Sequence, residues 1–253
     1  MWQLAAPRIK EQMLFQPMAP NNSELLLPGV LSAVSVIEQG GKIKASTNLE
    51  GKTEHLSCFV GGLLAISGKL YDRPKELDLA AKLTNGCVWA YASTKSGIAP
   101  DTFSLLNCKK SPFDCPWNEH EFNAAQESQP EKLPQPFLKV ERRGYLLRPE
   151  AIESVFIMYR VTGDPVWRER GWEMFTAIRD ATRTKYGHAS LSDVFVSGSD
   201  ANKMDKMESF WLSETLKYFY LLFAEPSLIS LDEWVFNTEA HPFRLQDEYR
   251  GHG

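Results

Sequence analysis

Two glutamates follow an arginine and a proline at the start of a predicted helix, in the segment RPEAIES. Glu150 and Glu153 are three residues apart, so both carboxylates project to nearly the same helix face. Arg148 is close enough in sequence to keep a carboxylate ionised through charge-assisted hydrogen bonds. Carboxylates serve as acid and base in glycoside hydrolysis, where a leaving oxygen is protonated while water attacks the anomeric carbon. The alternative interpretation is structural, because acidic residues in a first helical turn also complement the helix dipole.

A second candidate carboxylate interrupts an otherwise apolar helical pattern, the segment DKMESFWLSETLKYFYLLF. Phe210 and Glu214 lie four residues apart, so an aromatic ring and a carboxylate share one helix face. A glutamate in so apolar a helix is costly to bury unless it is paired. The alternative interpretation is therefore an ion pair with Lys217 or with a distant arginine.

The segment NTEAHP, near the end of the chain, places the Thr238 hydroxyl and the Glu239 carboxylate just before His241 and Pro242. Calcium binds oxygen ligands, including carbonyls, hydroxyls and waters. A single threonine does not make a calcium site, so this segment taken alone is typical of a turn.

The elements that must position these residues are mostly helical. A hairpin is indicated at residues 29–48, where two β-like runs flank Gly40 and Gly41. A proline opens the helix that carries Glu150, and Gly163-Asp164-Pro165 ends it. The run VFVSGS is expected to form a short strand that leads into a turn. Helices are expected at residues 1–16 (the end of a helix), 55–71, 74–94, 149–162, 166–182 and 206–223.

Residues 107–140 interrupt this pattern, because they are rich in Pro, Gln, Glu and Asn. We expect them to form a surface insertion, since a long stretch without periodicity inside a compact domain is usually functional or inserted. Residues 1–54 are expected to hold the helix end and the hairpin. Paired helices joined by turns, with one or two hairpins, favour a mostly α solenoid or barrel.

The composition excludes several classes of partner. The formal net charge is −4, and without a basic excess or a polybasic run we expect no nucleic acid or anionic membrane as partner. No segment reaches the roughly 20 apolar residues of a membrane span. The opening MWQLAAPRIKEQMLF lacks the pattern of a signal peptide. The sequon Asn21-Asn22-Ser23 matters only in a secreted protein.

The four cysteines fit no zinc-binding spacing, because there is no C-x-x-C pair. Cys58 and Cys87 lie 29 residues apart, and Cys108 and Cys115 lie seven apart. The apolar neighbours of Cys58 favour a buried free thiol, and the composition alone does not decide between this state and a disulfide.

Five ordered blocks of the sequence resemble the class I α-1,2-mannosidases, glycoside hydrolase family 47. They are HLSCFVGG, the region around Cys87 that ends in GIAPD, LLRPEAIESVFIMYRVTGD, DKMESFWLSETLKYFYLLF and VFNTEAHP. The resemblance implies a mostly α fold, a partial (α/α)7 barrel of paired helices with short β-hairpins. It also implies calcium-dependent, inverting hydrolysis of terminal α-1,2-linked mannose from high-mannose N-glycans.

The same resemblance implies roles for individual residues. Glu150 is expected to act as general base toward the attacking water. Asp101 is expected to be a further catalytic carboxylate, although the family usually has a glutamate there, which is longer by one methylene. Thr238 is expected to bind calcium through its hydroxyl and carbonyl oxygens, with glutamates holding the bound waters. The residues expected to line the deepest sugar subsite are His55, Arg148, Glu153, Phe210, Glu214 and Glu239.

Cys58 and Cys87 match the disulfide pair of the family, which implies a secretory-pathway protein of the endoplasmic reticulum or Golgi lumen, or a secreted one. The resemblance does not decide whether Cys108 and Cys115 form a second disulfide. Family members are nearly twice as long, and their N-terminal half supplies a catalytic acid glutamate and a further aspartate. This chain is therefore expected to be the C-terminal portion of one catalytic domain. The alternatives to an enzyme are a non-catalytic mannose-binding module and an inactive fragment.

Overall fold

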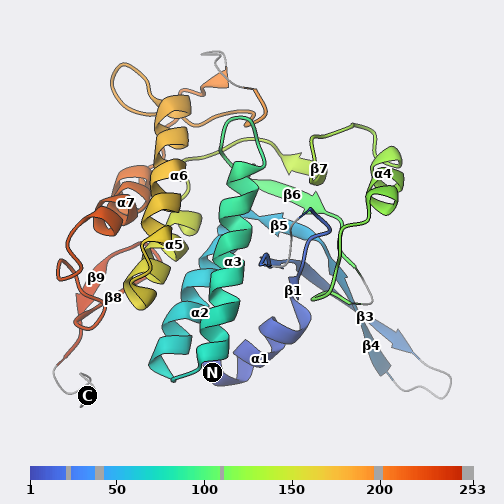
Figure 1. Ribbon diagram of the computed structural model, residues 1–253, viewed down its shortest axis with the longest axis horizontal. Helices are drawn as coiled ribbons and strands as arrows, with labels where there is room; N and C mark the ends of the chain where they lie inside the picture. The colour runs from blue at the N-terminus through green and yellow to red at the C-terminus, as the bar shows by residue number, and fades with distance from the viewer. Residues whose placement is uncertain (21–23, 38–42, 109–110, 197–201, 247–253) are drawn as a thin grey trace.

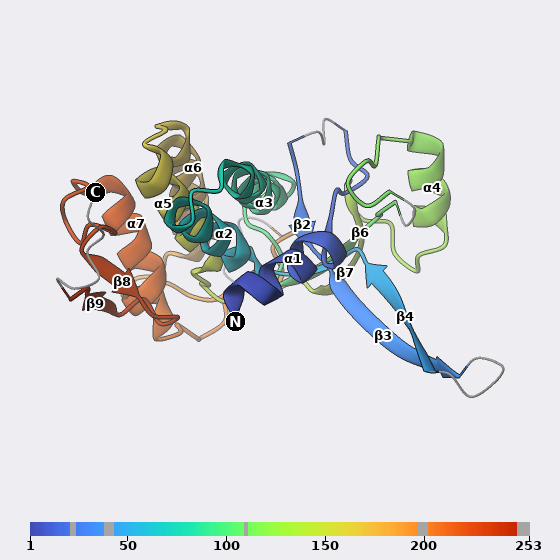
Figure 2. The same cartoon turned by 90° about the horizontal axis from the view of Figure 1, so that it is seen from below.

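The computed structural model describes residues 1–20, 24–37, 43–108, 111–196 and 202–246. Most helices gather at one side of the molecule, where the pair β8–β9 also lies, while the other strands and α4 lie toward the opposite side, from which the hairpin β3–β4 projects (Figures 1 and 2). The expected turn at Gly40-Gly41 and the sequon at residues 21–23 lie outside the described residues.

The helical side is built around α5 (Glu150–Thr162), which packs against α2, α3, α6 and α7. Gly62 allows the close approach of α2 to α5, because a Cβ at this position would lie 2.7 Å from Ile157 Cδ1. The helices are α1 (Trp2–Gln12), α2 (Phe59–Leu70), α3 (Pro74–Ala92), α4 (Glu119–Glu127), α5, α6 (Val166–Thr182) and α7 (Leu216–Phe223). A 3-10 turn, η1 (His55–Cys58), precedes α2, and a π-helical turn, η3 (Trp211–Thr215), precedes α7.

The strands pair in small antiparallel sheets. The three-stranded sheet has the order β5-β6-β7, and the other described strands form the pairs β1-β2, β3-β4 and β8-β9. Their bounds are β1 (Leu14–Phe15), β2 (Leu27–Pro28), β3 (Val30–Ile37), β4 (Ile43–Glu50), β5 (Lys52–Glu54), β6 (Thr102–Leu105), β7 (Phe137–Arg142), β8 (Trp234–Phe236) and β9 (Pro242–Arg244).

Most sequence-based expectations for the elements are confirmed, and four are corrected. The first helix ends at Gln12, and the next residues form β1. VFVSGS does not begin as a strand, because Val194 and Phe195 lie in a turn in which the Phe195 N–H donates to Asp193 Oδ1 at 2.8 Å; residues 197–199 lie outside the described part. The helix expected at 206–223 begins only near Phe210. The segment 107–140 is not irregular throughout, since it contains α4 and the first part of β7.

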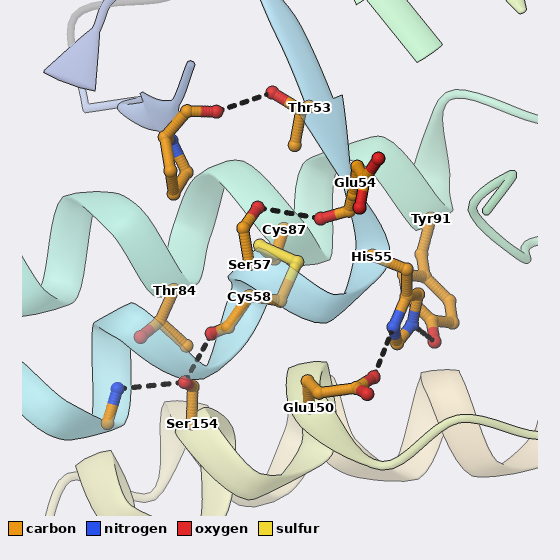
Figure 3. Close-up of a disulfide and its surroundings, with 12 residues drawn as sticks. Thr53, Glu54, His55, Ser57, Cys58, Thr84, Cys87, Tyr91, Glu150 and Ser154 are labelled. Carbon is orange, nitrogen blue, oxygen red and sulfur yellow. Dashed lines mark hydrogen bonds and ion pairs between the residues drawn. A yellow bond between two sulfur atoms is a disulfide. The ribbon is translucent and has the colours of Figure 1, made fainter. Parts of the chain in front are cut away.

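Two disulfides tie the elements together. Cys58 at the end of η1 is bonded to Cys87 in α3, which confirms the expected pair and overturns the free-thiol interpretation (Figure 3). Cys108 is bonded to Cys115, so the second pair is also bridged. Over the described ranges of the chain, none of the helices combines the length and apolar character that crossing a membrane requires.

Candidate active site

The first site residue, His55, lies where the strand β5 passes into η1. Its backbone N–H donates to the Asp101 carbonyl at 2.9 Å, and the Asp101 N–H donates to the Gly144 carbonyl at 3.0 Å. These bonds bring together the ends of β5, β6 and β7. His55 and Asp101 therefore meet at one end of the sheet, although 46 residues of sequence separate them.

The residues before α5 are held in an unusual conformation. Leu147 is fully buried and has a φ of 63°, in the left-handed region that non-glycine residues rarely adopt. Its carbonyl accepts a hydrogen bond from the buried Thr215 hydroxyl at 2.7 Å. The chain thus turns sharply into Arg148, and α5 begins at Glu150.

Glu150 is the centre of a cluster of side chains, His55, Tyr91, Arg148 and Glu150, which we call the base pocket because the sequence predicts that Glu150 acts as a general base. Glu150 Oε2 lies 2.7 Å from His55 Nδ1 (Figure 3). Glu150 Oε1 lies 3.6 Å from Arg148 Nη1. Burial raises the pKa of Glu150, but the hydrogen bond from His55 and the charges of His55 and Arg148 more than offset it, so the pKa falls below its ordinary value. Glu150 is therefore a buried carboxylate that stays ionised.

The far side of the His55 ring is also occupied. His55 Nε2 lies 2.6 Å from the Tyr91 hydroxyl, and Tyr91 is hydrogen-bonded to Tyr145. An ionised carboxylate only accepts hydrogen bonds, so His55 Nδ1 carries the proton in its hydrogen bond to Glu150. Burial raises the pKa of both tyrosines, which keeps their hydroxyls protonated.

Arg148 is fixed by Asp101. Asp101 Oδ1 lies 2.6 Å from Arg148 Nε, and Oδ2 lies 2.9 Å from Arg142 Nε. The shorter aspartate therefore reaches both guanidinium groups despite having one methylene fewer than glutamate. With a side chain only 5% exposed, Asp101 is a buried carboxylate paired on both oxygens.

Glu153 lies one helical turn after Glu150, and its pKa is shifted in the opposite direction. Burial, and the nearby charges of Glu150 and Glu214, raise its pKa to about 7, although a hydrogen bond with Tyr218 acts in the other direction. Burial also raises the pKa of Glu214, together with the charges of Glu150 and Glu239. Four glutamates thus repel one another in one region.

Glu214 comes from the π-helical turn η3, which starts directly after the half-buried Phe210. A π turn inserts one residue relative to an α-helix and is frequent at functional sites. The extra residue lies just where the helix carries Glu214. Phe210 and Glu214 are therefore separated by a π turn, in which a four-residue spacing no longer corresponds to one α-helical turn.

The last site residues lie in what we call the terminal turn, Asn237–His241, between β8 and β9. Asn237 Oδ1 accepts hydrogen bonds from the backbone N–H groups of Glu239 at 3.1 Å and His241 at 2.8 Å. Thr238 and Glu239 are exposed. The charge of Glu239 acts on Glu214, which places the terminal turn beside the glutamate cluster. Across the described residues, no group of three or more His, Cys, Asp or Glu side chains is arranged to bind a metal ion directly.

Hydrogen bonds or charge interactions connect most of the expected site residues into one network. Thr238 directly precedes Glu239 of this network, and Phe210 lies four residues before Glu214. The network also contains residues that sequence reasoning missed. Their partners lie far along the chain, so no local pattern identifies them, although the alternation in β7 indicates a strand that ends at Arg142. The missed residues are Tyr91, Arg142, Tyr145 and Tyr218, and Lys217 was considered only as an ion-pair partner of Glu214.

Known proteins are similar to this chain in sequence and in fold. Over 208 residues the chain is 36% identical to mannosyl-oligosaccharide alpha-1,2-mannosidase IA of Spodoptera frugiperda, and over 197 residues it is 38% identical to mannosyl-oligosaccharide 1,2-alpha-mannosidase IC of Homo sapiens. These matches cover 81% and 77% of this chain and 27% of each relative. The structure of an alpha-1,2-mannosidase from Trichoderma reesei matches 97% of this chain and 46% of its own, with a TM-score of 0.74 and 29% identity.

The chain thus spans about half of the solved relative and a smaller part of the curated ones. The sequence profile of Glycosyl hydrolase family 47 matches residues 1–245. This match covers nearly the whole chain, and it agrees with the five blocks noted in the sequence. The chain belongs to glycosyl hydrolase family 47.

Proposed function

We propose that this chain carries the general base and the sugar-binding residues of a calcium-dependent, inverting α-1,2-mannosidase. The substrate is terminal α-1,2-linked mannose of high-mannose N-glycans. One observation supports the proposal most strongly: the buried Glu150 carboxylate lies 2.7 Å from His55 Nδ1 on one oxygen and 3.6 Å from Arg148 Nη1 on the other. A carboxylate that such partners hold ionised can accept a proton from water, as a general base does.

In the proposed reaction, Glu150 accepts a proton from the water that attacks the anomeric carbon. His55 and Arg148 hold Glu150 ionised and aimed, and Asp101 orients Arg148. An inverting glycosidase also needs an acid whose carboxyl group lies about 6.5–9.5 Å from the base. In this proposal the acid and the further aspartate belong to a segment that precedes this chain in a longer protein, as the resemblance implies.

The residues present fit a calcium ion. The charge of Glu150 raises the pKa of both Glu153 and Glu214, and the charge of Glu239 also raises that of Glu214, so negative charge accumulates where a hard divalent cation would neutralise it. Thr238 would hold the ion through its hydroxyl and carbonyl oxygens, and Glu239 and Glu214 would hold its waters. Calcium, when bound, supplies a positive centre that polarises and orients sugar hydroxyls.

The residues around Glu150 form the proposed deepest sugar subsite. Carboxylates and a guanidinium suit the hydroxyl groups of a mannose ring, since they accept and donate several hydrogen bonds each. An aromatic ring suits the apolar face of the sugar. The subsite comprises His55, Arg148, Glu153, Phe210, Glu214 and Glu239.

We also propose that the fold is part of an (α/α)7 barrel. An apolar hollow of about 850 Å³ lies on α6 and α7, and its lining residues Trp172 and Tyr220 are 53% and 67% exposed. Large exposed apolar surfaces mark contact sites. Further helices of a closed barrel are the natural cover for this hollow. A structure of the longer protein in which the hollow stays open to solvent would contradict this part.

The two disulfides support a secretory-pathway location, because such bonds persist in oxidising compartments. The test is thiol labelling of the protein recovered from cells. We expect both cysteine pairs to be protected, and free thiols at all four positions would contradict this location.

The activity test compares this chain with the same chain extended by its upstream reading frame. Each is incubated with a high-mannose oligosaccharide in calcium and in a chelator. We expect the extended protein to release mannose only with calcium, with inverted anomeric configuration in the NMR spectrum. Calcium-dependent binding without release would favour a mannose-binding module, which the isolated base pocket and terminal turn also suit. Loss of cooperative unfolding would favour an inactive fragment.

A further inference from the structure

Lys217, in the first turn of α7, reaches across to the terminal turn. Its Nζ donates a hydrogen bond to the Ala240 carbonyl at 2.7 Å. Lys217 is partly buried, and the two residues lie 23 positions apart, so this contact joins two separate elements. An ammonium group that donates to a carbonyl makes a charge-assisted bond, which is stronger than a neutral one.

The terminal turn needs such support. Ala240 is fully buried and has a φ of 56°, a conformation that costs free energy for a residue other than glycine. Such a conformation persists only where surrounding contacts impose it. From within the turn, Asn237 binds the N–H groups of Glu239 and His241. From outside, Lys217 binds the carbonyl of the strained residue itself.

The position of Lys217 also connects the terminal turn to the glutamate cluster. Lys217 follows Glu214 by three residues, across the junction of the π turn η3 with α7. The charge of Lys217 lowers the pKa of Glu214, while burial and the charges of Glu150 and Glu239 raise it. One side chain is therefore close to Glu214 and at the same time bonded to the backbone two residues after Thr238.

We propose that Lys217 is a positioning residue for the sugar and calcium site. Its hydrogen bond to Ala240 sets where Thr238 and Glu239 lie relative to Glu214. Lys217 acts through the backbone of the terminal turn and needs no contact with sugar or ion. The part of this inference that concerns calcium rests on the proposed function, and the part that concerns the turn does not.

The sign of the effect on calcium separates positioning from simple charge. A lysine near a cation site repels the cation, so removing its charge alone would tighten calcium binding. Loss of the bond to Ala240 would instead release the turn and weaken binding. Positioning and electrostatics therefore predict opposite changes for the same substitution.

The experiment uses the full chain, and the extended protein in parallel, with Lys217→Met, Lys217→Arg and the control Lys69→Met. Lys69 is an exposed lysine on α2. Backbone amide exchange of the terminal turn is measured first without calcium, with α3 amides as the check of folding. Calcium binding is then measured by calorimetry. Lys217→Gln replaces the methionine variant if that variant does not fold.

For Lys217→Met we expect the Glu239 and His241 amides to exchange about tenfold faster and calcium to bind about tenfold more weakly, each equivalent to about 1.4 kcal/mol. Lys217→Arg should recover part of both, and Lys69→Met should match the parent. Unchanged exchange would overturn the inference, and so would tighter calcium binding. If exchange accelerates but the parent binds no calcium, positioning of the turn stands and the calcium part of the proposed function fails.

Discussion

The base pocket and the terminal turn are built in opposite ways. Glu150 is only 7% exposed, and each of its carboxylate oxygens faces a side chain that a third residue holds in place. Thr238 and Glu239 are exposed, and the backbone around them depends on Asn237 and Lys217. The comparison teaches that this fold fixes the proposed base before any ligand binds, while the proposed calcium turn depends on a few contacts near the surface.

The Ser154 hydroxyl adds to this rigidity. It donates to the Cys58 carbonyl at 2.6 Å and accepts from the Gly62 N–H at 2.8 Å (Figure 3). The helix that carries Glu150 is thereby locked to the turn that carries His55. No bond of this kind joins Thr238 to another element in the described residues, so the four predictions below probe the two regions separately.

The largest expected effects come from removing the Glu150 carboxylate from the base pocket or the Thr238 hydroxyl from the terminal turn. Both variants are made in the extended protein, which is expected to release mannose. Glu150→Gln removes the base, and we expect mannose release to fall by about 10³-fold while calcium binding changes little. Thr238→Ala removes the ligand hydroxyl, and we expect calcium binding to fall while the base pocket stays intact. Rates of mannose release and calcium calorimetry on both variants check this. If both variants lost calcium binding equally, the base pocket and the terminal turn would not act as separate regions, and the comparison would be wrong.

The next effect concerns the disulfide beside the base pocket. Replacing Cys58 and Cys87 with alanine opens a 29-residue loop and should lower the free energy of unfolding by about 3–4 kcal/mol. The control pair, Cys108 and Cys115, closes only seven residues and should cost about 2 kcal/mol. Urea unfolding of both double variants measures the difference. A larger loss for the control pair would show that loop closure is not the cause.

A third prediction uses Glu153, whose pKa burial and its acidic neighbours raise from 4.5 to about 7. A raised pKa means that the folded protein binds the proton more tightly, so stability is complete below pH 4.5 and declines as the pH rises to about 7. Glu153→Gln removes this decline. In calcium-free buffer, the variant should gain up to about 3 kcal/mol over the parent between pH 4.5 and pH 8. If the free energies of unfolding of the parent and of Glu153→Gln changed with pH in parallel, the raised pKa of Glu153 would be contradicted.

The smallest effect is expected at Asn237, which holds the terminal turn from within. Asn237→Ala removes the acceptor of the Glu239 and His241 N–H groups, so these two amides should exchange faster. Global stability should change by less than about 1 kcal/mol, because the turn is exposed and only a local cap is lost. Hydrogen exchange measures the two amides, and urea unfolding measures the global free energy of unfolding. A large global loss would place the turn within the cooperative core.

The helices could be predicted where local signals define their ends. The expected helix 166–182 matches α6, because Gly163 ends α5 in the left-handed conformation and Pro165 precedes the new helix. The helix expected from residue 206 begins later and contains a π turn. A single inserted residue leaves the apolar pattern almost unchanged, and the Thr215 hydroxyl finds its partner 68 residues away. Local sequence carries no signal for either feature.

The same limit applies to the site. Sequence spacing correctly places Glu150 and Glu153 on one turn of a helix, but it does not show that their pKa values move apart. That difference arises because His55, 95 residues earlier, bonds to one carboxylate and not to the other. The resemblance to a family named most of the site residues, and the tertiary structure added Arg142 and the three tyrosines that contact them.

The central claim is that the fold alone keeps Glu150 ionised and Glu153 about half protonated at pH 7. The direct test is a carbon-13 NMR titration of the two side-chain carboxyl groups in the calcium-free protein, with Glu153→Gln and Glu150→Gln to assign the signals. The account predicts a pKa for Glu150 below 4.5 and one for Glu153 near 7. Titration in the reverse order, or of both groups together near 4.5, would contradict it.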